Sequence, residues 1–320
     1  MLKRVSAEQA RELRSSIEEG LEEMSMRVMR EWLAEVRRAA LQAVESPSPN
    51  VLLAAAGDEM PGMGTVAGWW SQRVDESLMQ AVRAALIRSF NRWTDMAIDA
   101  SPAEAATNAY LAQVRDRLVQ GSHFGVTVYA DSFDRIRLSL ATSAAEGWSR
   151  QQLAQRIAAE LSWEKDGAYW RGQQAAIDSQ IDGLLDALGE PGTAAREWAR
   201  LNDPEVSRLR EARNYAIKHL DAERSIWQTR ATLIARTEAT GGANFGSWQA
   251  LAAEGVKTKV WEATPGGRTR PTHLQASGQE VSLASPFLVG GAALQFPGDP
   301  RGPIEEIANC RCTMLGGDYL

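Results

Sequence analysis

Both cysteines of this 320-residue chain lie in one tetrapeptide near the C-terminus, Asn309-Cys310-Arg311-Cys312. Zinc prefers thiolate and imidazole ligands, and two residues spaced at i and i+2 on a strand point to the same face. His273 and Asp299 are the nearby side chains that could complete a metal site. Cys310, Cys312 and His273 are therefore candidate zinc ligands, with Asp299 or a water molecule as the fourth.

Two other interpretations of the cysteines remain open. Structural zinc sites usually have Cys-x2-4-Cys spacing and four clear ligands, and only three are present here. A Cys310–Cys312 disulfide would close a small, strained ring and is rare in a reducing compartment. Cysteine is often fully buried, so the pair could instead pack under the last strand, with Arg311 pointing away to Glu305 or Glu306. We expect this structural role without a bound cofactor, and zinc is the alternative.

An acid/base site is the second chemical hypothesis. Arg236, Glu238, His273 and Asp299 could form an anion clamp with a general acid and base, as nucleases and ADP-ribosyltransferases use. The sequence contains no nucleophile motif, phosphate-binding loop or paired metal carboxylates. Arg236 and Glu238 lie two apart on an expected helix and so face different sides. We expect no enzymatic activity, with Arg236 holding a turn and Glu238 capping or pairing; a toxin-like enzyme on a helical arm is the alternative.

The residues that precede this C-terminal region predict helices. Ser6 and Gln9 form a capping box, and an amphipathic helix is expected from 6 to about 46, where "SPSPN" ends it. Its apolar residues recur at steps of three and four: Leu13, Ile17, Leu21, Met24, Val28, Trp32 and Val36. Such a stripe needs a partner, either inside the fold or in another subunit.

Further helices are expected along the chain. After a loop at 51–69, one helix carries Val74, Leu78, Val82, Leu86, Phe90 and Trp93 in phase, and "SPAE" at 101–104 starts another that ends at "GSHFG". Residues 145–157 predict a helical hairpin that turns at Gly147, and only Arg150 and Arg156 support a DNA-reading function for it. Helices at about 171–188, 193–201 and 203–240 follow.

The pattern changes at Gly241. A glycine-rich segment and a brief helix lead to "VKTKVWEA", whose alternation predicts a strand, and then to short strands with tight turns. The fold class is therefore mainly α with a small C-terminal α+β domain and a long helical N-terminal arm or bundle. The expected units are 1–130, a helical hairpin with inserted helices at 131–227, and the α+β domain at 228–320.

Six short pieces in fixed order resemble the phage Mu F-like family of head morphogenesis proteins, also called the SPP1 minor-head-like or minor capsid family. They are "LIARTEATGGANFG", "AAEGVKTKVWEA", "TRPTH", a glycine at 278, "FPGDP" and "NCRC". The residues that carry the resemblance are Arg236, Thr237, Glu238, Trp261, Arg270, His273, Gly278, Pro297, Asp299, Asn309, Cys310, Arg311 and Cys312. Two departures are Glu262, where an aspartate nearby is common, and Phe296, where a second proline is common.

The resemblance implies a minor head protein with a role in capsid assembly, DNA packaging or DNA ejection. It implies the portal protein and inner capsid as partners, and a place in the virion head near the portal vertex. The net charge of −6 restricts any contact with packaged DNA to a local patch. The charged N-terminal sequence and the lack of a long apolar run favour assembly in the bacterial cytoplasm and no membrane partner. Unmatched apolar stripes in the helical half would suit docking onto partner helices.

Overall fold

The computed structural model describes residues 3, 5–45, 63–96, 101–120, 135–136, 138–139, 141–143, 145–164, 166–188, 203–221, 225–264, 266 and 268–317. The expected breaks at 46–50 and 121–125 and the expected helix at 193–201 lie outside these residues.

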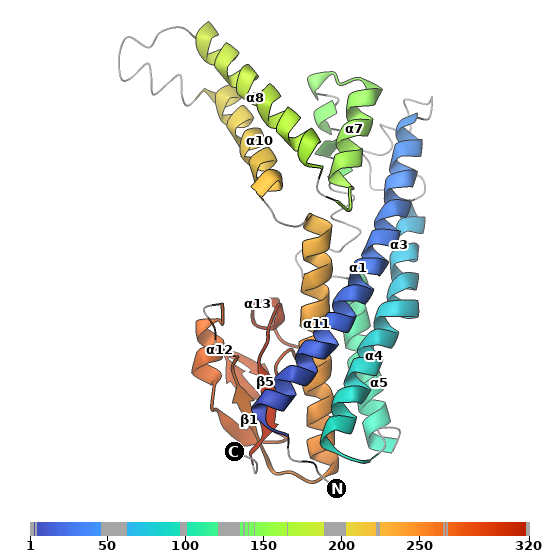
Figure 1. The fold of residues 1–320 in the computed structure, drawn as a ribbon, viewed down its shortest axis with the longest axis vertical. Helices are drawn as coiled ribbons and strands as arrows, with labels where there is room; N and C mark the ends of the chain where they lie inside the picture. Colours follow the sequence, from blue (N-terminus) through green and yellow to red (C-terminus); the bar gives the residue numbers. More distant parts are fainter. Residues whose placement is uncertain are drawn as a thin grey trace, which may run out of the picture.

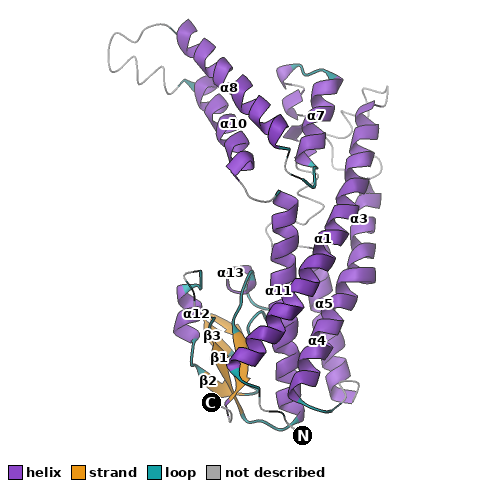
Figure 2. Ribbon diagram, in the orientation of Figure 1, coloured by secondary structure: helices purple, strands orange, loops and turns teal. Residues whose placement is uncertain are grey.

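The described residues are mainly helical, and a small α+β domain closes the chain, as predicted (Figures 1 and 2). The longer helices are α1 (Ala7–Glu45), α3 (Met63–Arg73), α4 (Met79–Trp93), α5 (Ser101–Gln120), α7 (Arg150–Glu160), α8 (Gly167–Ala187), α10 (Pro204–Asp221) and α11 (Ile226–Ala253). A π-helical turn, η1 (Val74–Leu78), joins α3 to α4. The helical segment therefore begins at Met63, inside the stretch that the sequence predicted as a loop.

Helix α1 finds its partner inside the same chain. Its Ile17, Val28, Trp32 and Val36 are all buried, and the helix packs mainly along α11. The apolar stripe of α1 is thus buried within its own chain. The expectation of an unmatched stripe available for docking is therefore wrong for this helix. Among the described residues six tryptophans are fully buried, and the Trp32 ring contacts Trp70 and Trp227 edge to face.

Helix α11 differs from its predicted form at both ends. The single helix expected over 203–240 is two helices, because Ser225 and Gln228 form a complete capping box that starts α11 anew. At its other end α11 continues through Gly241, Gly242 and Gly246 instead of breaking. Glycine lowers helix propensity by about 1 kcal/mol, but these glycines are buried between α4 and the C-terminal domain, where packing outweighs propensity.

The C-terminal domain contains two small antiparallel sheets. Strands β2 (Glu280–Ser282), β1 (Thr258–Glu262) and β5 (Thr313–Gly316) form the first in that order, and β3 (Phe287–Val289) pairs with β4 (Ala292–Leu294). The short helices α12 (Pro271–Ala276) and α13 (Ile304–Ile307) connect them. Cys310 and Cys312 precede β5, so the cysteines lie in the segment before a strand and not on the strand itself.

Helices α8 and α10 form a hairpin arm that extends away from the lower half of the molecule (Figure 1). Asp166 caps α8, and a small core of Trp170 with Ala159 and Ala216 fixes the base of the arm. No helix among the described residues combines the length and apolar character needed to cross a bilayer.

Candidate functional site

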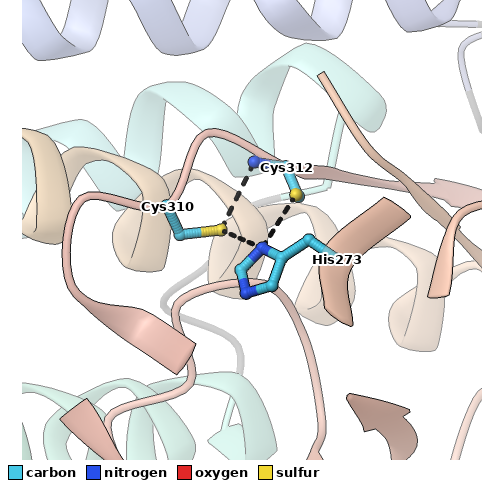
Figure 3. Close-up of side chains that lie close together, drawn as sticks. All are labelled: His273, Cys310 and Cys312. Atoms are coloured by element: carbon cyan, nitrogen blue, oxygen red, sulfur yellow. Dashed lines mark hydrogen bonds between the residues drawn. The ribbon is translucent and has the colours of Figure 1, made fainter. Parts of the chain in front are cut away.

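Three side chains from different parts of the C-terminal domain meet at one buried point (Figure 3). His273 Nδ1 lies 3.3 Å from Cys312 Sγ and 3.7 Å from Cys310 Sγ. Each of the three residues is only 2% exposed. Both cysteines are free thiols, and the backbone N–H of Cys312 donates to Cys310 Sγ at 3.4 Å. Three of the four candidate ligands that the sequence suggested, His273, Cys310 and Cys312, therefore lie together.

The imidazole orientation is set by a carboxylate on the opposite side of the ring. Glu306 Oε2 lies 3.0 Å from His273 Nε2 and also accepts a hydrogen bond from the Thr272 hydroxyl at 2.9 Å. A carboxylate that accepts from Nε2–H leaves the Nδ1 lone pair directed at the two sulfurs. Arg311 does not reach Glu305 or Glu306 as expected; its guanidinium lies 3.6 Å from Glu18 on α1.

The two thiols do not titrate alike. Hydrogen bonding from Cys310, assisted by His273, lowers the pKa of Cys312 to about 5. The same hydrogen bond, together with burial, raises the pKa of Cys310 well above its ordinary value. Arg14 from α1 is 5% exposed and interacts electrostatically with both sulfurs, while burial lowers its own pKa. The pocket thus favours one thiolate beside one protonated thiol.

One face of α11 fixes the start of the Asn-Cys-Arg-Cys segment. Arg236 Nη1 donates to Asn309 Oδ1 at 2.6 Å, and the Thr237 hydroxyl accepts from the Asn309 backbone N–H at 3.0 Å. Asn309 adopts φ of 58°, a left-handed conformation that asparagine tolerates better than most residues. Arg236 also pairs with Glu18 at 2.7 Å, so it joins α1, α11 and the turn.

The next turns of α11 fix the end of the same segment. The Thr240 hydroxyl donates to the Cys310 carbonyl at 2.6 Å, and the Asn244 amide donates to the Cys312 carbonyl at 3.0 Å. The Asn244 side-chain oxygen accepts from the Met314 backbone N–H at 2.8 Å. These bonds hold the backbone of both cysteines against α11.

Asp299 does not join the cysteine cluster, so it is not the fourth ligand. Its carboxylate accepts from the backbone N–H groups of Gln295 and Arg301 and from the Arg301 guanidinium, at 2.7–3.1 Å. It is 1% exposed and caps the turn of its own "FPGDP" segment. The group of potential ligands within the described residues contains only His273, Cys310 and Cys312.

The four residues of the acid/base hypothesis do not form one site, because each contacts different partners. Glu238 pairs with Arg117 of α5 in the core, whereas Arg236 binds Glu18 and Asn309 on the other side of α11. Asp299 is bound by Arg301, and only His273 faces the cysteines. The structural roles expected for Arg236, in holding a turn, and for Glu238, in pairing, match these contacts.

The remaining signature residues support the histidine and its neighbours. The Trp261 ring meets the His273 ring edge to face at 5.6 Å. Arg270 donates to the Ala308 carbonyl just before the cysteine segment. Gly278 has φ of 80° and donates its backbone N–H to the Trp261 carbonyl at 2.8 Å, and the Pro297 carbonyl accepts from the Asn244 amide. These residues position the site without belonging to it.

Sequence reasoning missed Glu306 as the partner of His273, and it missed Thr240 and Arg117 as partners of signature residues. Glu306 was considered only as an acid for Arg311. Arg236, Thr237, Thr240 and Asn244 are spaced at three and four residues and so share one face of a helix. This spacing indicates a common contact surface only if α11 continues past Gly241. Arg117 lies far away in the chain, and no local pattern indicated its partner.

Lys259 is a buried amine on β1 of the same domain. It has no exposed surface, donates from Nζ to the Gln295 carbonyl at 2.7 Å, and lies over the Phe287 ring at 5.0 Å. Burial lowers its pKa from 10.5 to about 7, against the opposing attraction of Asp299. The cost of charging this amine inside the protein makes stability depend on pH.

We expect the free energy of unfolding to rise with pH between about 7 and 10.5 because of Lys259. In that window the unfolded chain binds a proton that the folded chain lacks, which corresponds to a slope of up to about 1.4 kcal/mol per pH unit. Denaturant unfolding of wild type and Lys259→Met, each measured at several pH values in the window, isolates this slope as their difference. A difference that does not vary with pH would contradict the assignment.

A family profile described as "Phage Mu protein F like protein" matches residues 134–315. The matched region begins ahead of α7, includes the α8–α10 arm, and ends one residue before the end of β5. It contains every residue of the cysteine cluster and of its α11 support. Neither the comparison with curated proteins nor the comparison with solved structures gave a match.

Proposed function

The chain belongs to the phage Mu protein F like family of bacteriophage head morphogenesis proteins, and from this premise we propose that it docks on the portal vertex during head assembly. The observation that carries the proposal is the family match over more than half of the chain. Membership implies association with the virion head. The portal protein as the binding partner is the finer step that requires a test.

The architecture supports a binding role more than a catalytic one. The C-terminal domain is packed on α11, and α11 is packed on α1 and α4, so the domain and the helices form one continuous core. The residues that carry the family resemblance make their contacts within this packed core. The α8–α10 arm is the part of the described structure that extends away from that core (Figure 1).

A groove of about 480 Å³ lies at the base of the arm, between α7, α8, α10 and the helical residues around 138–146. Aromatic and arginine side chains line it, namely Trp148, Arg156, Tyr169, Arg208 and Tyr215. Tryptophan, tyrosine and arginine are the residues that most often dominate binding energy at protein interfaces. Leu138, 58% exposed, and Ile177 add an apolar component to the same groove. We assign the portal protein to this groove.

Charges placed in the groove are expected to weaken portal binding. The full chain carrying Leu138→Glu and Ile177→Glu, co-expressed with the tagged portal protein of its phage, should lose binding by about thirtyfold, because buried charge at a hot spot costs about 2 kcal/mol or more. The measurement is the amount of chain that co-purifies with the portal, followed by titration of the purified pair.

Leu288→Glu is the matched control, because Leu288 is equally apolar and 64% exposed but lies on β3 of the C-terminal domain. It should bind the portal like wild type. Equal binding by the double variant would remove the groove from the interface. A wild-type chain that captures capsid protein but not portal would overturn the portal assignment.

A further inference from the structure

We propose that His273, Cys310 and Cys312 bind one structural zinc ion. Zinc–sulfur and zinc–nitrogen bonds of about 2.3 and 2.0–2.1 Å, at a tetrahedral angle, place the nitrogen about 3.5 Å from each sulfur. The observed separations of 3.3 and 3.7 Å bracket this value, and all three ligand atoms lie within 4.8 Å of one another. Figure 3 shows Nδ1 directed between the two sulfurs.

The surroundings of the histidine match those of a metal ligand. Histidines that bind zinc usually donate their other ring N–H to a carboxylate, which fixes the tautomer and strengthens the ligand. Glu306 has this position at 3.0 Å from Nε2, and the Thr272 hydroxyl holds the same carboxylate oxygen. A histidine needed only for packing would not require a partly buried carboxylate aligned behind it.

The local charge also suits two thiolates. Zinc binding releases the remaining thiol protons to solvent, and two thiolates then neutralise the ion. Arg14 interacts electrostatically with both sulfurs and Arg270 with Cys310, so positive groups already offset negative sulfur in this pocket. An isolated pair of buried anions would otherwise be costly.

The ion would be a structural cross-link, since its protein ligands are closed off from solvent at 2% exposure. No fourth side-chain ligand joins the cluster within the described part of the chain, which leaves the fourth position to a water molecule, in contrast to zinc sites that four protein ligands close. The site ties α12 to the segment that leads into β5, and it thereby locks the edge strand of the three-stranded sheet. Its function is independent of portal binding.

The full chain, purified under reducing conditions with a tag that does not bind metals, is expected to contain about one zinc per chain by elemental analysis. Removal of the metal with a chelator should lower the melting temperature, and added zinc chloride alone should restore it. Cobalt(II) in place of zinc should give thiolate-to-metal charge-transfer absorption. Cys310→Ser and Cys312→Ser should each weaken that absorption and the double variant should lose it, which reports ligation even where stability also falls.

Glu306→Gln tests the positioning carboxylate, with an expected loss of zinc affinity of about 10–100-fold and no change in ligand number. Glu305→Gln is the matched control, because Glu305 is exposed and adjacent. The proposal is overturned if wild type contains no zinc and added zinc does not raise its melting temperature. It is equally overturned if the Cys310→Ser, Cys312→Ser double variant retains the metal, because the ion then lies elsewhere.

Discussion

Replacing Glu238 by alanine is expected to lower the free energy of unfolding by about 3–5 kcal/mol, the cost of breaking a buried ion pair by removing one partner. Glu238 on α11 and Arg117 on α5 pair with both side chains only 1% exposed. Arg117 Nη2 donates to Glu238, whereas its Nε and Nη1 atoms have no hydrogen-bond partner among the described residues. The variant would therefore leave a guanidinium buried without its counter-charge. Equilibrium unfolding in guanidinium chloride measures the loss.

The double variant Arg117→Met, Glu238→Leu separates charge from packing. It should recover most of the lost stability, because apolar side chains of similar volume often replace a buried pair at little cost. Glu205→Ala removes one partner of an exposed pair with Arg208 and should leave the unfolding midpoint unchanged. If Glu238→Ala unfolded at the wild-type midpoint, the Arg117–Glu238 pair would not be buried away from water as the structure describes.

Gly246→Ala is the second change with a large expected effect, a loss of about 3 kcal/mol in the free energy of unfolding from overpacking. An added Cβ would lie 2.4 Å from the Leu86 carbonyl oxygen, 2.9 Å from Ser89 Cβ and 3.0 Å from the Phe90 backbone nitrogen. Two of these three atoms belong to the α4 backbone, so they cannot move without moving the helix. Thermal and denaturant unfolding of the variant measure the cost of separating α4 from α11.

Glycines in open helical positions provide the control. A Cβ at Gly20 on α1 or Gly183 on α8 would meet nothing within 4 Å. Alanine at either position should raise stability by about 0.5–1 kcal/mol, since it reduces the freedom of the unfolded chain. If Gly246→Ala stabilised the protein as these do, the close approach of the two helices would be refuted.

The fold class was predictable because its signals are local. The stripe on α1, the phase of α4 and the alternation in β1 each follow from periodicity over a few turns or residues. The continuation of α11 through Gly241, Gly242 and Gly246 was not predictable in this way. Glycine opposes a helix locally, and the reason for keeping it is backbone that lies far away in the sequence, namely α4 at Gly246 and Gly298 at Gly241.

The candidate site was half predictable for the same reason. Residue type identified His273, Cys310 and Cys312, because thiols and imidazole have a distinct chemistry wherever they occur. Asp299 has an equally suitable chemistry, yet its carboxylate is used by the turn in which it lies. Glu306 offered no pattern of its own, since an acid becomes a histidine partner only when the fold sets α13 against α12.

The pairing of α1 with α11 has a consequence for how the protein is made. Helix α1 leaves the ribosome first, and its partner is completed only at Ala253, roughly 200 residues later. At translation rates of about 5–20 residues per second, α11 is completed on the order of 10–40 s after α1, so the part of the α1 stripe that packs on α11 stays exposed for that time. Transiently exposed apolar surface of this kind promotes aggregation, so the nascent chain is more exposed to that risk than the finished protein.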